Sequence, residues 1–336
     1  MKQTTIGING FGRIGRTLFR LLSKQPQLRV VAINDLADAG TLAHLLKYDS
    51  IHGQFPFEVS HTDTHILVDH REVALLNHRS PKEIPWSDYG VDIVIEATGK
   101  FKDTASLESH LHNGAKKVIL SAPPVEDHIK MVVYGINHET LDADDHIISN
   151  ASCTTNNAAP MIQVIQDLCG IEQAYITTIH SYTSDQSLHD QAHKDLRRAR
   201  AATQSIVPTT TGAAKALTKI FPDLADVIGG CGIRVPVPNG SLTDITFNVK
   251  RTTTIEEIND AFLQISRNQL KNILYYTKDP IVSIDINNSS YSCTFDSLMT
   301  SVIGKMVKII GWYDNETGYS SRIVDLINYL IDKKYL

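Results

Sequence analysis

The 336-residue sequence is poor in cysteine, and its few cysteines are not placed to build a bridge or a metal site. They lie far apart, without a CxxC or a Cys/His cluster at zinc spacing, and the 14 histidines include no HExxH arrangement. We therefore expect neither a disulfide framework nor a structural metal. The four cysteines are Cys153, Cys169, Cys231 and Cys293.

Long hydrophobic runs and an excess of positive charge are also missing. No apolar run reaches the length of a membrane span, and the first residues, MKQTTIGING, enter a strand pattern without signal-peptide architecture. The 32 lysines and arginines against 37 aspartates and glutamates leave a formal net charge of -5, so there is no polyanion-binding surplus. We expect a cytoplasmic protein without a membrane or nucleic-acid partner.

What is present is a chain of two-domain length that opens on a nucleotide-binding pattern. Residues 4–9, TTIGIN, predict a buried strand that leads into a GxGxxG and the helical pattern RTLFRLLSK, and a second apolar strand over 29–34 ends at Asp35. In a dinucleotide-binding βαβ unit the glycines let the pyrophosphate approach a helix N-terminus, and the acid binds the ribose hydroxyls. Asp35 would repel a 2′-phosphate, so the pattern indicates NAD; the alternative is a glycine-rich turn without function. The glycines are Gly10, Gly12 and Gly15.

The rest of the first half predicts an α/β fold with a doubly wound, Rossmann-type sheet. Strand signals at 91–99 and 116–123, with a helix between them, end in small or polar residues. Because such a sheet binds its ligand at the carboxyl ends of its strands, Thr98, Gly99 and Ser121 are predicted cofactor contacts. The other elements expected here are a helix over 41–48, an insertion of short antiparallel strands within 49–85, and strands over 131–137 and 146–150 that finish the sheet.

The stretch SNASCTTNNAAP, residues 149–160, places Cys153 at the start of a predicted helix whose apolar run reads MIQVIQDL. The unpaired N–H groups and the positive dipole end of that helix would favour thiolate over thiol, as a nucleophilic cysteine requires. The alternative is an ordinary buried thiol beside a capping sequence.

Beyond that helix, the sequence predicts an α+β domain with a mostly antiparallel sheet covered on one face. A strand reading AYITTIHSYT places His180 near its end, and a long polar loop then carries HKDLRRARAA at 193–202. Taken alone, this arginine run is either a solvated charged segment or a phosphate site; the hydroxyl-rich turn PTTTGAAK and Arg234 supply the other usual parts of an anion site. Alternating segments read LTDITFNVK, IVSIDI, YSCTFD and KMVKIIGWY, and residues 314–334 predict a helix with apolar positions at Ile323, Leu326, Ile327 and Leu330.

Eight of these motifs, in order, resemble those of the phosphorylating glyceraldehyde-3-phosphate dehydrogenases, and the resemblance covers essentially the full length. The matching stretches are INGFGRIGR, EATG, SNASCTTN, TTIHSYT, HKDLRRARAA, TTTGAAKA, RVPVP and WYDNETGY. The resemblance implies an NAD-binding domain at 1–152 that a C-terminal helix at 315–336 rejoins, a catalytic domain at 153–314, and a homotetramer.

The resemblance also implies roles for single residues. Cys153 matches the family nucleophile and His180 the general base. Residues in the motifs that hold the substrate phosphate or the attacking inorganic phosphate are Ser152, Thr154, Thr183, Asp185, Arg198, Thr211, Gly212 and Arg234. The predicted NAD contacts are Gly10, Gly12, Arg13, Ile14, Gly15, Asp35, Arg79, Thr98, Gly99, Ser121, Asn315 and Tyr319.

The implied reaction is the NAD-dependent oxidative phosphorylation of D-glyceraldehyde 3-phosphate to 1,3-bisphosphoglycerate. The Cys153 thiolate would attack the aldehyde carbon to form a thiohemiacetal. His180 would accept the hydroxyl proton as hydride leaves for the nicotinamide, which gives a thioester that inorganic phosphate then cleaves. Two anion sites are needed because substrate and second nucleophile each carry a phosphate.

Two positions depart from the family pattern, and two rival functions stay open. Gln191-Ala192 stand before His193 where NAD-specific members usually carry Leu-Pro, so NADP use is not excluded, and Asn157 stands where a second cysteine often follows the nucleophile, so no disulfide can form at that pair. Erythrose-4-phosphate dehydrogenase shares the cysteine and histidine but uses water on the thioester, and NDLADAGTLAHLLKYDSIHG looks somewhat like that relative, whereas SYT, TTTG and DNETGY follow the phosphorylating enzyme. The other alternative is a binding protein that keeps the fold without turnover.

Overall fold

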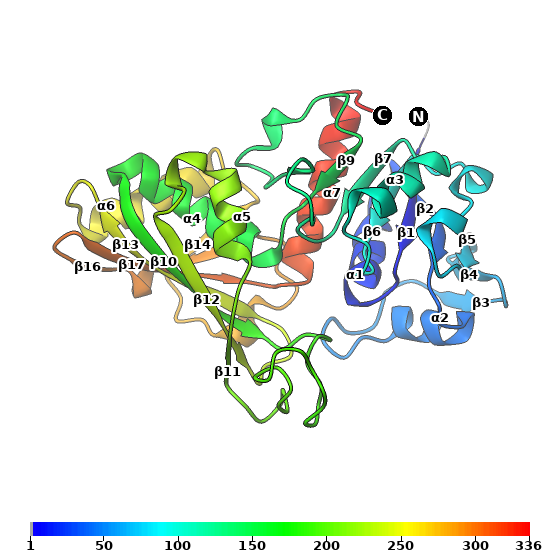
Figure 1. Cartoon of the computed structure of the whole chain (residues 1–336), viewed down its shortest axis with the longest axis horizontal. Coiled ribbons are helices and arrows are strands. Elements are labelled where there is room, and N and C mark those ends of the chain that lie inside the picture. The colour runs from blue at the N-terminus through cyan, green and yellow to red at the C-terminus, as the bar shows by residue number, and fades with distance from the viewer. Residues whose placement is uncertain (1–2) are drawn as a thin grey trace. The chain divides into compact units, whose positions relative to one another are not determined.

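A computed structural model describes residues 3–336 and divides the chain into two compact units (Figure 1). The first unit runs to Tyr134 and also includes His138–Ala151 and Ser320–Leu336. The second unit consists of Gly135–Asn137 and Ser152–Tyr319.

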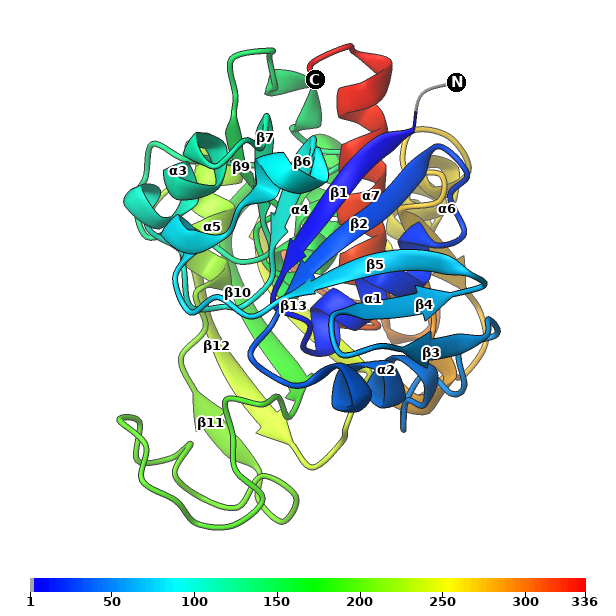
Figure 2. The same ribbon diagram turned by 90° about the vertical axis from the view of Figure 1, so that its right-hand side faces the viewer.

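The first unit is built on a nine-stranded sheet in the order β3-β4-β5-β2-β1-β6-β7-β9-β8, whose β3-to-β1 half is seen best in Figure 2. All pairs from β5 to β8 are parallel, as in a doubly wound nucleotide-binding sheet. Every residue of β6 and β7 is buried, which fits strands covered on both faces. The bounds are β1 Thr4–Asn9, β2 Leu28–Asn34, β3 Val59–His61, β4 His65–Val68, β5 Arg71–Leu76, β6 Ile93–Glu96, β7 Lys117–Leu120, β8 Lys130–Met131 and β9 Ile147–Ser149.

Helices connect these strands, and the last helix of the chain supplies part of the core. The bounds are α1 Arg13–Leu22, α2 Ala39–Lys47, α3 Thr104–His112 and α7 Thr317–Asp332, with short 3₁₀ helices at Pro81–Glu83, Trp86–Tyr89 and His138–Thr140. The predicted apolar stripe of α7 is confirmed, since Ile323, Leu326, Ile327 and Leu330 are each 0% exposed. The predicted α/β class with a Rossmann-type sheet is likewise confirmed.

Two segments of this unit differ in detail from the prediction. The short antiparallel strands expected within 49–85 are present, since β4 pairs antiparallel with β3 and with β5; what the sequence did not predict is that β5 pairs in parallel with β2, so the segment extends the main sheet. The predicted strand over 131–137 contributes only β8, Lys130–Met131. The apolar residues Val132 and Val133 are buried, so their hydrophobic signal reported burial rather than strand pairing.

The second unit carries an eight-stranded sheet in the order β11-β12-β10-β13-β17-β15-β14, with β16 beside β17. Five of its pairs are antiparallel, and only β10–β12 and β14–β15 are parallel, which confirms the mostly antiparallel prediction. Figure 1 shows α4, α5 and α6 on one side of this sheet. The bounds are α4 Cys153–Cys169, β10 Ile171–Ser181, β11 Val207–Thr209, α5 Ala213–Ile220, β12 Ile228–Val235, β13 Ser241–Val249, α6 Ile255–Arg267, β14 Leu274–Thr277, β15 Cys293–Asp296, β16 Ser301–Ile303 and β17 Met306–Tyr313, with 3₁₀ helices at Pro222–Leu224, Ser283–Ile286 and Ser297–Met299.

One segment of this unit was wrongly predicted as a strand and forms a short 3₁₀ helix instead. The segment IVSIDI contains a 3₁₀ helix at Ser283–Ile286. The Asp285 carboxylate accepts a hydrogen bond from the backbone N–H of Val282 at 2.8 Å, so a local side-chain contact replaces the ladder that the alternation suggested.

Candidate active site

The glycines of the loop between β1 and α1 are required for two different physical reasons. Gly10 has a φ of +92°, and a Cβ there would lie 2.7 Å from the Thr98 backbone nitrogen; a Cβ at Gly15 would lie 2.2 Å from the Gly10 carbonyl oxygen. Both positions are therefore glycine because the chain itself leaves no room. Gly12 is exposed, has a φ of -71°, and a Cβ there would meet nothing within 4 Å. The space above Gly12 at the start of α1 is where a pyrophosphate would approach the backbone.

Asp35 lies where the ribose contact of a dinucleotide site is expected. It follows β2, and its carboxylate accepts a hydrogen bond from the Phe11 backbone N–H at 2.7 Å and from the Ala37 N–H at 3.1 Å. These bonds fix the carboxylate beside the glycine loop. Its negative charge at this place favours ribose hydroxyls over a 2′-phosphate.

A buried carboxylate that no sequence motif singled out supports the residues next to the glycine loop. Glu96, at the end of β6, is 0% exposed and accepts hydrogen bonds from the Asn9 amide at 2.5 Å, from the Thr98 backbone N–H at 2.9 Å and from the Thr98 hydroxyl. His110 lies 3.2 Å from the same carboxylate, and the Trp86 indole donates to the other ring nitrogen of His110 at 2.9 Å. Because an indole N–H only donates, His110 accepts on Nδ1 and donates from Nε2 to Glu96.

The other predicted cofactor contacts are distributed over both units. Arg13 opens α1 and forms an ion pair with Asp49 at 2.5 Å. Ile14 is the next residue of α1, Thr98 and Gly99 follow β6, and Ser121 follows β7, so these lie at the carboxyl edge of the sheet. Arg79 is exposed after β5. The remaining two, Asn315 and Tyr319, belong to the second unit and are 7% and 4% exposed.

The predicted helix at Cys153 is confirmed, and Cys153 is its first residue. The Ser152 hydroxyl caps α4 by accepting the Thr155 backbone N–H at 3.1 Å, and the preceding Ala151 has a φ of +56°, an uncommon conformation for alanine. This turn leaves the sulfur of the half-buried Cys153 at the positive end of the helix dipole.

His180 faces Cys153 from β10, with Nε2 3.4 Å from the sulfur. It is 6% exposed. Its other nitrogen, Nδ1, lies 2.7 Å from the Ser181 carbonyl oxygen and 2.5 Å from Nη1 of Arg234, which also donates to that carbonyl at 2.9 Å. Arg234 reaches this place because β10 and β12 are neighbouring parallel strands in which His180 pairs with Arg234.

This placement determines which protonation states the ring supports. A proton on Nδ1, donated to the Ser181 carbonyl, leaves Nε2 able to accept a proton from sulfur or from a substrate hydroxyl. A proton on Nε2 instead leaves Nδ1 to accept from Arg234. Both nitrogens therefore have a partner in either neutral form of His180.

The shifts in pKa favour the neutral forms of both Cys153 and His180. Burial, reinforced by the positive charge of Arg234, lowers the pKa of His180 to about 3. Desolvation raises the pKa of the Cys153 thiol, while the Arg234 charge and hydrogen bonds at Thr154 oppose that rise. His180 is therefore an unprotonated base at neutral pH, and thiolate formation requires a proton transfer to it.

The arginine run forms a polar cluster with the hydroxyl-rich turn. Arg198 donates to the Thr209 hydroxyl at 2.9 Å and to the Thr210 carbonyl at 3.3 Å, and it forms an ion pair with Asp185 at 2.6 Å. The Arg198 hydrogen bond and charge lower the pKa of Asp185 although burial opposes them. Thr209, to which Arg198 donates, ends β11, and β11 pairs with β12, the strand that carries Arg234.

The remaining predicted phosphate-site residues are placed as follows. The Thr154 hydroxyl lies 2.9 Å from the Tyr313 hydroxyl and is 5% exposed, which makes it part of the packing behind the cysteine. The Thr211 hydroxyl accepts the Ala213 N–H at 3.2 Å at the start of α5, and Gly212 leaves its Cβ space open. Thr183 is half-buried in the segment after β10.

Sequence reasoning missed two residues that position this site. Tyr313 ends β17 and contacts both Thr154 and Thr178 through its hydroxyl at 2.9 Å, and its ring meets the His180 ring edge-on at 5.9 Å. Thr211 was predicted as a phosphate-site residue, whereas Thr209, two residues earlier, was not. The signal was present for both, since Tyr313 lies in WYDNETGY and Thr209 in TTTGAAKA, but strand register decides which of several hydroxyls faces the site.

Some site classes have no counterpart in the part of the chain that the structure describes. Among residues 3–336 no three His, Cys, Asp or Glu side chains gather where they could hold a metal ion. The four cysteines are free thiols. No helix in the same range combines the length and apolarity needed to cross a membrane.

Two features define the class of protein as an NAD-binding dehydrogenase. The first is a dinucleotide-binding loop on a parallel sheet, and the second is a cysteine at the start of a helix within hydrogen-bond distance of a histidine. Two family models match the chain: "Glyceraldehyde 3-phosphate dehydrogenase, NAD binding domain" over residues 4–104 and "Glyceraldehyde 3-phosphate dehydrogenase, C-terminal domain" over residues 152–315. The chain belongs to the glyceraldehyde-3-phosphate dehydrogenase family, as the resemblance had predicted.

Curated relatives match over nearly the whole length. The chain is 53% identical to glyceraldehyde-3-phosphate dehydrogenase of Streptomyces coelicolor, with 96% of each chain covered. It is 50% identical to glyceraldehyde-3-phosphate dehydrogenase 1 of Bacillus cereus, covering 98% of this chain and 99% of the relative. It is also 50% identical to the Geobacillus stearothermophilus enzyme, with 98% of each covered.

Proposed function

We propose that the protein oxidises D-glyceraldehyde 3-phosphate with NAD and inorganic phosphate to 1,3-bisphosphoglycerate. The contact between the Cys153 sulfur and His180 Nε2 at 3.4 Å, at the first turn of α4, carries this proposal. A thiol beside an unprotonated imidazole and a helix N-terminus can become a thiolate without an external base.

The first covalent step joins the Cys153 sulfur to the aldehyde carbon as the thiol proton passes to His180 Nε2. The carbonyl oxygen becomes an oxyanion, which the protonated His180 and the backbone N–H at Cys153 would stabilise; His180 Nε2 returns its proton to this oxygen, which gives a thiohemiacetal and restores the neutral imidazole. His180 Nε2 then removes the hydroxyl proton; NAD, when bound, would supply the acceptor for the hydride that leaves the same carbon. The product at Cys153 is a thioester, which phosphate cleaves with release of the thiolate.

Arg234 couples substrate binding to the strength of this base. Nη1 of Arg234 lies 2.5 Å from His180 Nδ1, and its positive charge adds to burial in lowering the pKa of the imidazole. A substrate phosphate on Arg234 brings negative charge that offsets this effect. His180 thus becomes more basic when the substrate to be deprotonated is present.

A second anion site is proposed around Arg198, Thr209 and Thr211. Arg198 already donates to Thr209 and pairs with Asp185, so its guanidinium is held in one orientation. A phosphate would compete with Asp185 for Nη1 of Arg198. Ser152 and Gly212, at the starts of α4 and α5, are expected to complete the two anion sites with N–H groups.

For NAD, the residues present fit the cofactor. No atom of the chain covers Gly12 at the start of α1, so a pyrophosphate can reach the backbone there. The Asp35 carboxylate, which follows β2, is held in place by a hydrogen bond from the Phe11 N–H. We propose that the predicted contacts from Gly10 to Tyr319 hold NAD, with Asp35 selecting it over NADP. Because Gln191-Ala192 stand before His193 in place of Leu-Pro, the ratio of turnover with NAD to turnover with NADP is the measurement that tests this selection.

The deciding experiment is the initial rate of NADH formation from glyceraldehyde 3-phosphate with and without inorganic phosphate. We expect phosphate-dependent turnover with NAD and a loss of about 10³-fold or more in Cys153→Ser, with Cys231→Ser as a matched control for a half-buried thiol outside the dyad. Phosphate-independent oxidation of erythrose 4-phosphate would instead identify the rival dehydrogenase activity. Turnover that survives in Cys153→Ser would refute the assigned nucleophile.

We also propose the wider setting that the family resemblance implies: functional domains at 1–152 with 315–336 and at 153–314, a homotetramer, and a cytoplasmic location. Large apolar side chains exposed on the second unit support the tetramer, among them Ile206 at 69%, Ile284 at 65% and Ile303 at 68%. The free thiols support a reducing compartment, because a nucleophilic cysteine must stay unoxidised.

A further inference from the structure

A row of buried polar side chains crosses the carboxyl edge of the parallel sheet in the first unit. Asn34, Asn9 and Glu96 are the last residues of β2, β1 and β6, and the strand registers place Asn34 beside Asn9 and Asn9 beside Glu96. None of the three is more than 4% exposed. The Asn34 amide donates to the Asn9 side-chain oxygen at 2.8 Å, and the Asn9 amide donates to the Glu96 carboxylate at 2.5 Å. One hydrogen-bonded row therefore ties three neighbouring strand ends together.

Asn34 extends the row into the loop that follows β5. Its amide donates to the His78 carbonyl oxygen at 3.0 Å, and its side-chain oxygen accepts the His78 N–H at 2.8 Å. Four predicted NAD contacts follow residues of the extended row by one or two positions in the chain. They are Gly10, Asp35, Arg79 and Thr98. The backbone that presents these contacts is therefore positioned by the row.

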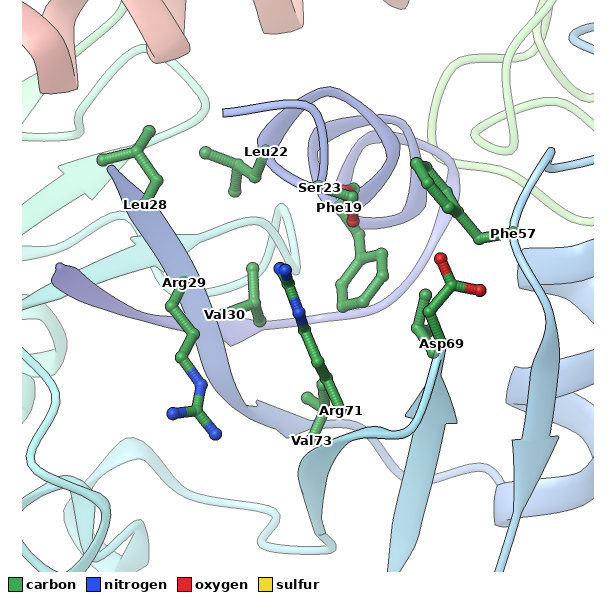
Figure 3. A pocket seen from close by; sticks show the side chains of 11 residues that line it. Phe19, Leu22, Ser23, Leu28, Arg29, Val30, Phe57, Asp69, Arg71 and Val73 are labelled. Carbon is green, nitrogen blue, oxygen red and sulfur yellow. Dashed lines mark hydrogen bonds between the residues drawn. The ribbon is translucent and has the colours of Figure 1, made fainter. Parts of the chain in front are cut away.

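The opposite edge of the same sheet is built from different side chains. There β2 begins at Leu28, and Phe19 and Leu22 of α1 line a hollow together with Leu28 and Val30 (Figure 3). Apolar side chains can pack a strand end without the cost of burying polar groups. A buried carboxylate and two buried amides are thus more than packing requires, and they lie at the edge where a doubly wound sheet binds its ligand.

His110 and Trp86 close the row at its β6 end. His110 of α3 is 0% exposed, and its Nε2 lies 3.2 Å from the Glu96 carboxylate. The indole of Trp86, also 0% exposed, donates to His110 Nδ1 at 2.9 Å. Because Nδ1 must accept this bond, the neutral ring carries its proton on Nε2 and donates it to Glu96. Trp86 therefore fixes the tautomer that holds the carboxylate.

We propose that His110 is a positioning residue for NAD, which acts through its hydrogen bond to Glu96. One Glu96 oxygen accepts from Asn9 and His110, and the other accepts from the Thr98 backbone N–H and hydroxyl. Loss of His110 removes a donor that fixes this carboxylate, so Asn9 and Thr98 lose a fixed acceptor. Contacts whose supporting hydrogen bonds are lost bind their ligand more weakly. The inference rests on the proposed use of NAD and concerns a residue behind the cofactor contacts.

Calorimetric titration of the full-length protein with NAD, in the absence of substrate, tests this role. His110→Leu removes both hydrogen bonds of the ring, and we expect the Kd for NAD to rise at least about tenfold. In the turnover assay the KM for NAD should rise by a similar factor, while kcat falls less than about threefold, because no group of the proposed reaction is altered. His110→Gln offers an acceptor and a donor on one amide and should return the Kd to within about threefold of the unmodified protein.

Two further variants separate positioning from stability. Ile66 of β4 is 0% exposed, so Ile66→Ala should lower the free energy of unfolding as His110→Leu does, yet leave the Kd for NAD within about twofold. Trp86→Phe keeps an aromatic ring but removes the N–H that fixes the His110 tautomer. We expect it to raise the Kd for NAD about threefold or more.

An unchanged Kd in His110→Leu overturns the proposal, and so does an equal rise in Ile66→Ala, which would reduce His110 to a role in stability. If His110→Leu does not fold, Trp86→Phe decides, and an unchanged Kd in that variant overturns the proposal. NAD binding that depends on His110 supports the inference even if glyceraldehyde 3-phosphate is not oxidised, so failure of the proposed activity is distinguishable. An unmodified protein that binds no NAD overturns both proposals.

Discussion

At the scale of single residues, the state of His180 is the property on which the chemistry depends. The ring is 6% exposed and lies against the Arg234 guanidinium, so it resists protonation that a free imidazole would accept. An imidazolium would be a poor base for either the thiol or the thiohemiacetal hydroxyl. The neutral form is the one that can accept the proton.

The pH dependence of this ring can be measured directly. Because its pKa is lowered to about 3, we expect the His180 signal in a ¹³C-histidine NMR titration to stay constant from pH 8 to pH 5, where free histidine titrates near about 6.5. In Arg234→Gln the pKa should rise, because the adjacent positive charge is gone. His180→Asn identifies the signal. A titration midpoint of 6 or above in the unmodified, ligand-free protein would contradict the neutral-base assignment.

A second residue-scale prediction concerns Glu96, whose four accepted hydrogen bonds hold the strand end beneath the nucleotide loop. In Glu96→Gln an amide NH₂ must face a donor from Asn9, Thr98 or His110. We expect a loss of about 1–3 kcal/mol in the free energy of unfolding, together with weaker NAD binding. Urea unfolding and NAD titration measure the two effects. Exposed Glu83→Gln should stay within about 0.5 kcal/mol; an equally small change in Glu96→Gln would show that the network is dispensable.

At the scale of elements, two glycines near the start of α1 have different roles: Gly15 is required for folding, and Gly12 is expected to be required for binding. Gly15→Ala places a Cβ 2.2 Å from the Gly10 carbonyl, so the turn must shift and both stability and NAD affinity should fall. Gly12→Ala meets no atom of the chain. It should cost about 1 kcal/mol or less as a poorer helix cap, yet weaken NAD binding strongly, because the new methyl lies where the pyrophosphate approaches.

Thermal unfolding and NAD titration of the two variants check this difference. Gly53→Ala is not a suitable control because Gly53 has a φ of +74°, whereas Ser60→Ala changes an exposed residue of β3 and should alter neither quantity. If Gly12→Ala bound NAD as tightly as the unmodified protein, the cofactor would not pass over Gly12.

Elements also show where sequence patterns stop being informative. The β1-turn-α1-β2 unit and the start of α4 at Cys153 were predictable, because turn glycines, capping hydroxyls and helical periodicity are local signals. The segments 131–137 and 281–286 were mistaken for full strands. In the first segment Val132 and Val133 are buried without strand pairing, and in the second Val282 and Ile284 are exposed on a 3₁₀ turn; an apolar or alternating pattern cannot distinguish these outcomes from a strand.

At the scale of the whole molecule, the proposed homotetramer can be tested by measuring the mass of the particle in solution. The 37.3 kDa chain should sediment as a particle of about four times that mass if the proposed homotetramer forms. Ile303→Lys, which puts a charge on an apolar side chain that is 68% exposed, should weaken assembly if that surface is an interface. Glu72→Lys tests the effect of added charge alone. A particle of one chain mass at micromolar concentration would refute the tetramer.

The sequence by itself determined the class of each unit, the dinucleotide loop with Asp35, and the cysteine at the start of a helix, because each depends on residues close together in the chain. The family followed from eight motifs in order. Only the tertiary structure decided that His180 Nε2 faces Cys153, that Arg234 lies against His180, and that Glu96 supports the loop. The Cys153–His180, Arg234–His180 and Asn9–Glu96 contacts join elements that are separated in the sequence. Sheet order and register, which no local pattern encodes, bring them together.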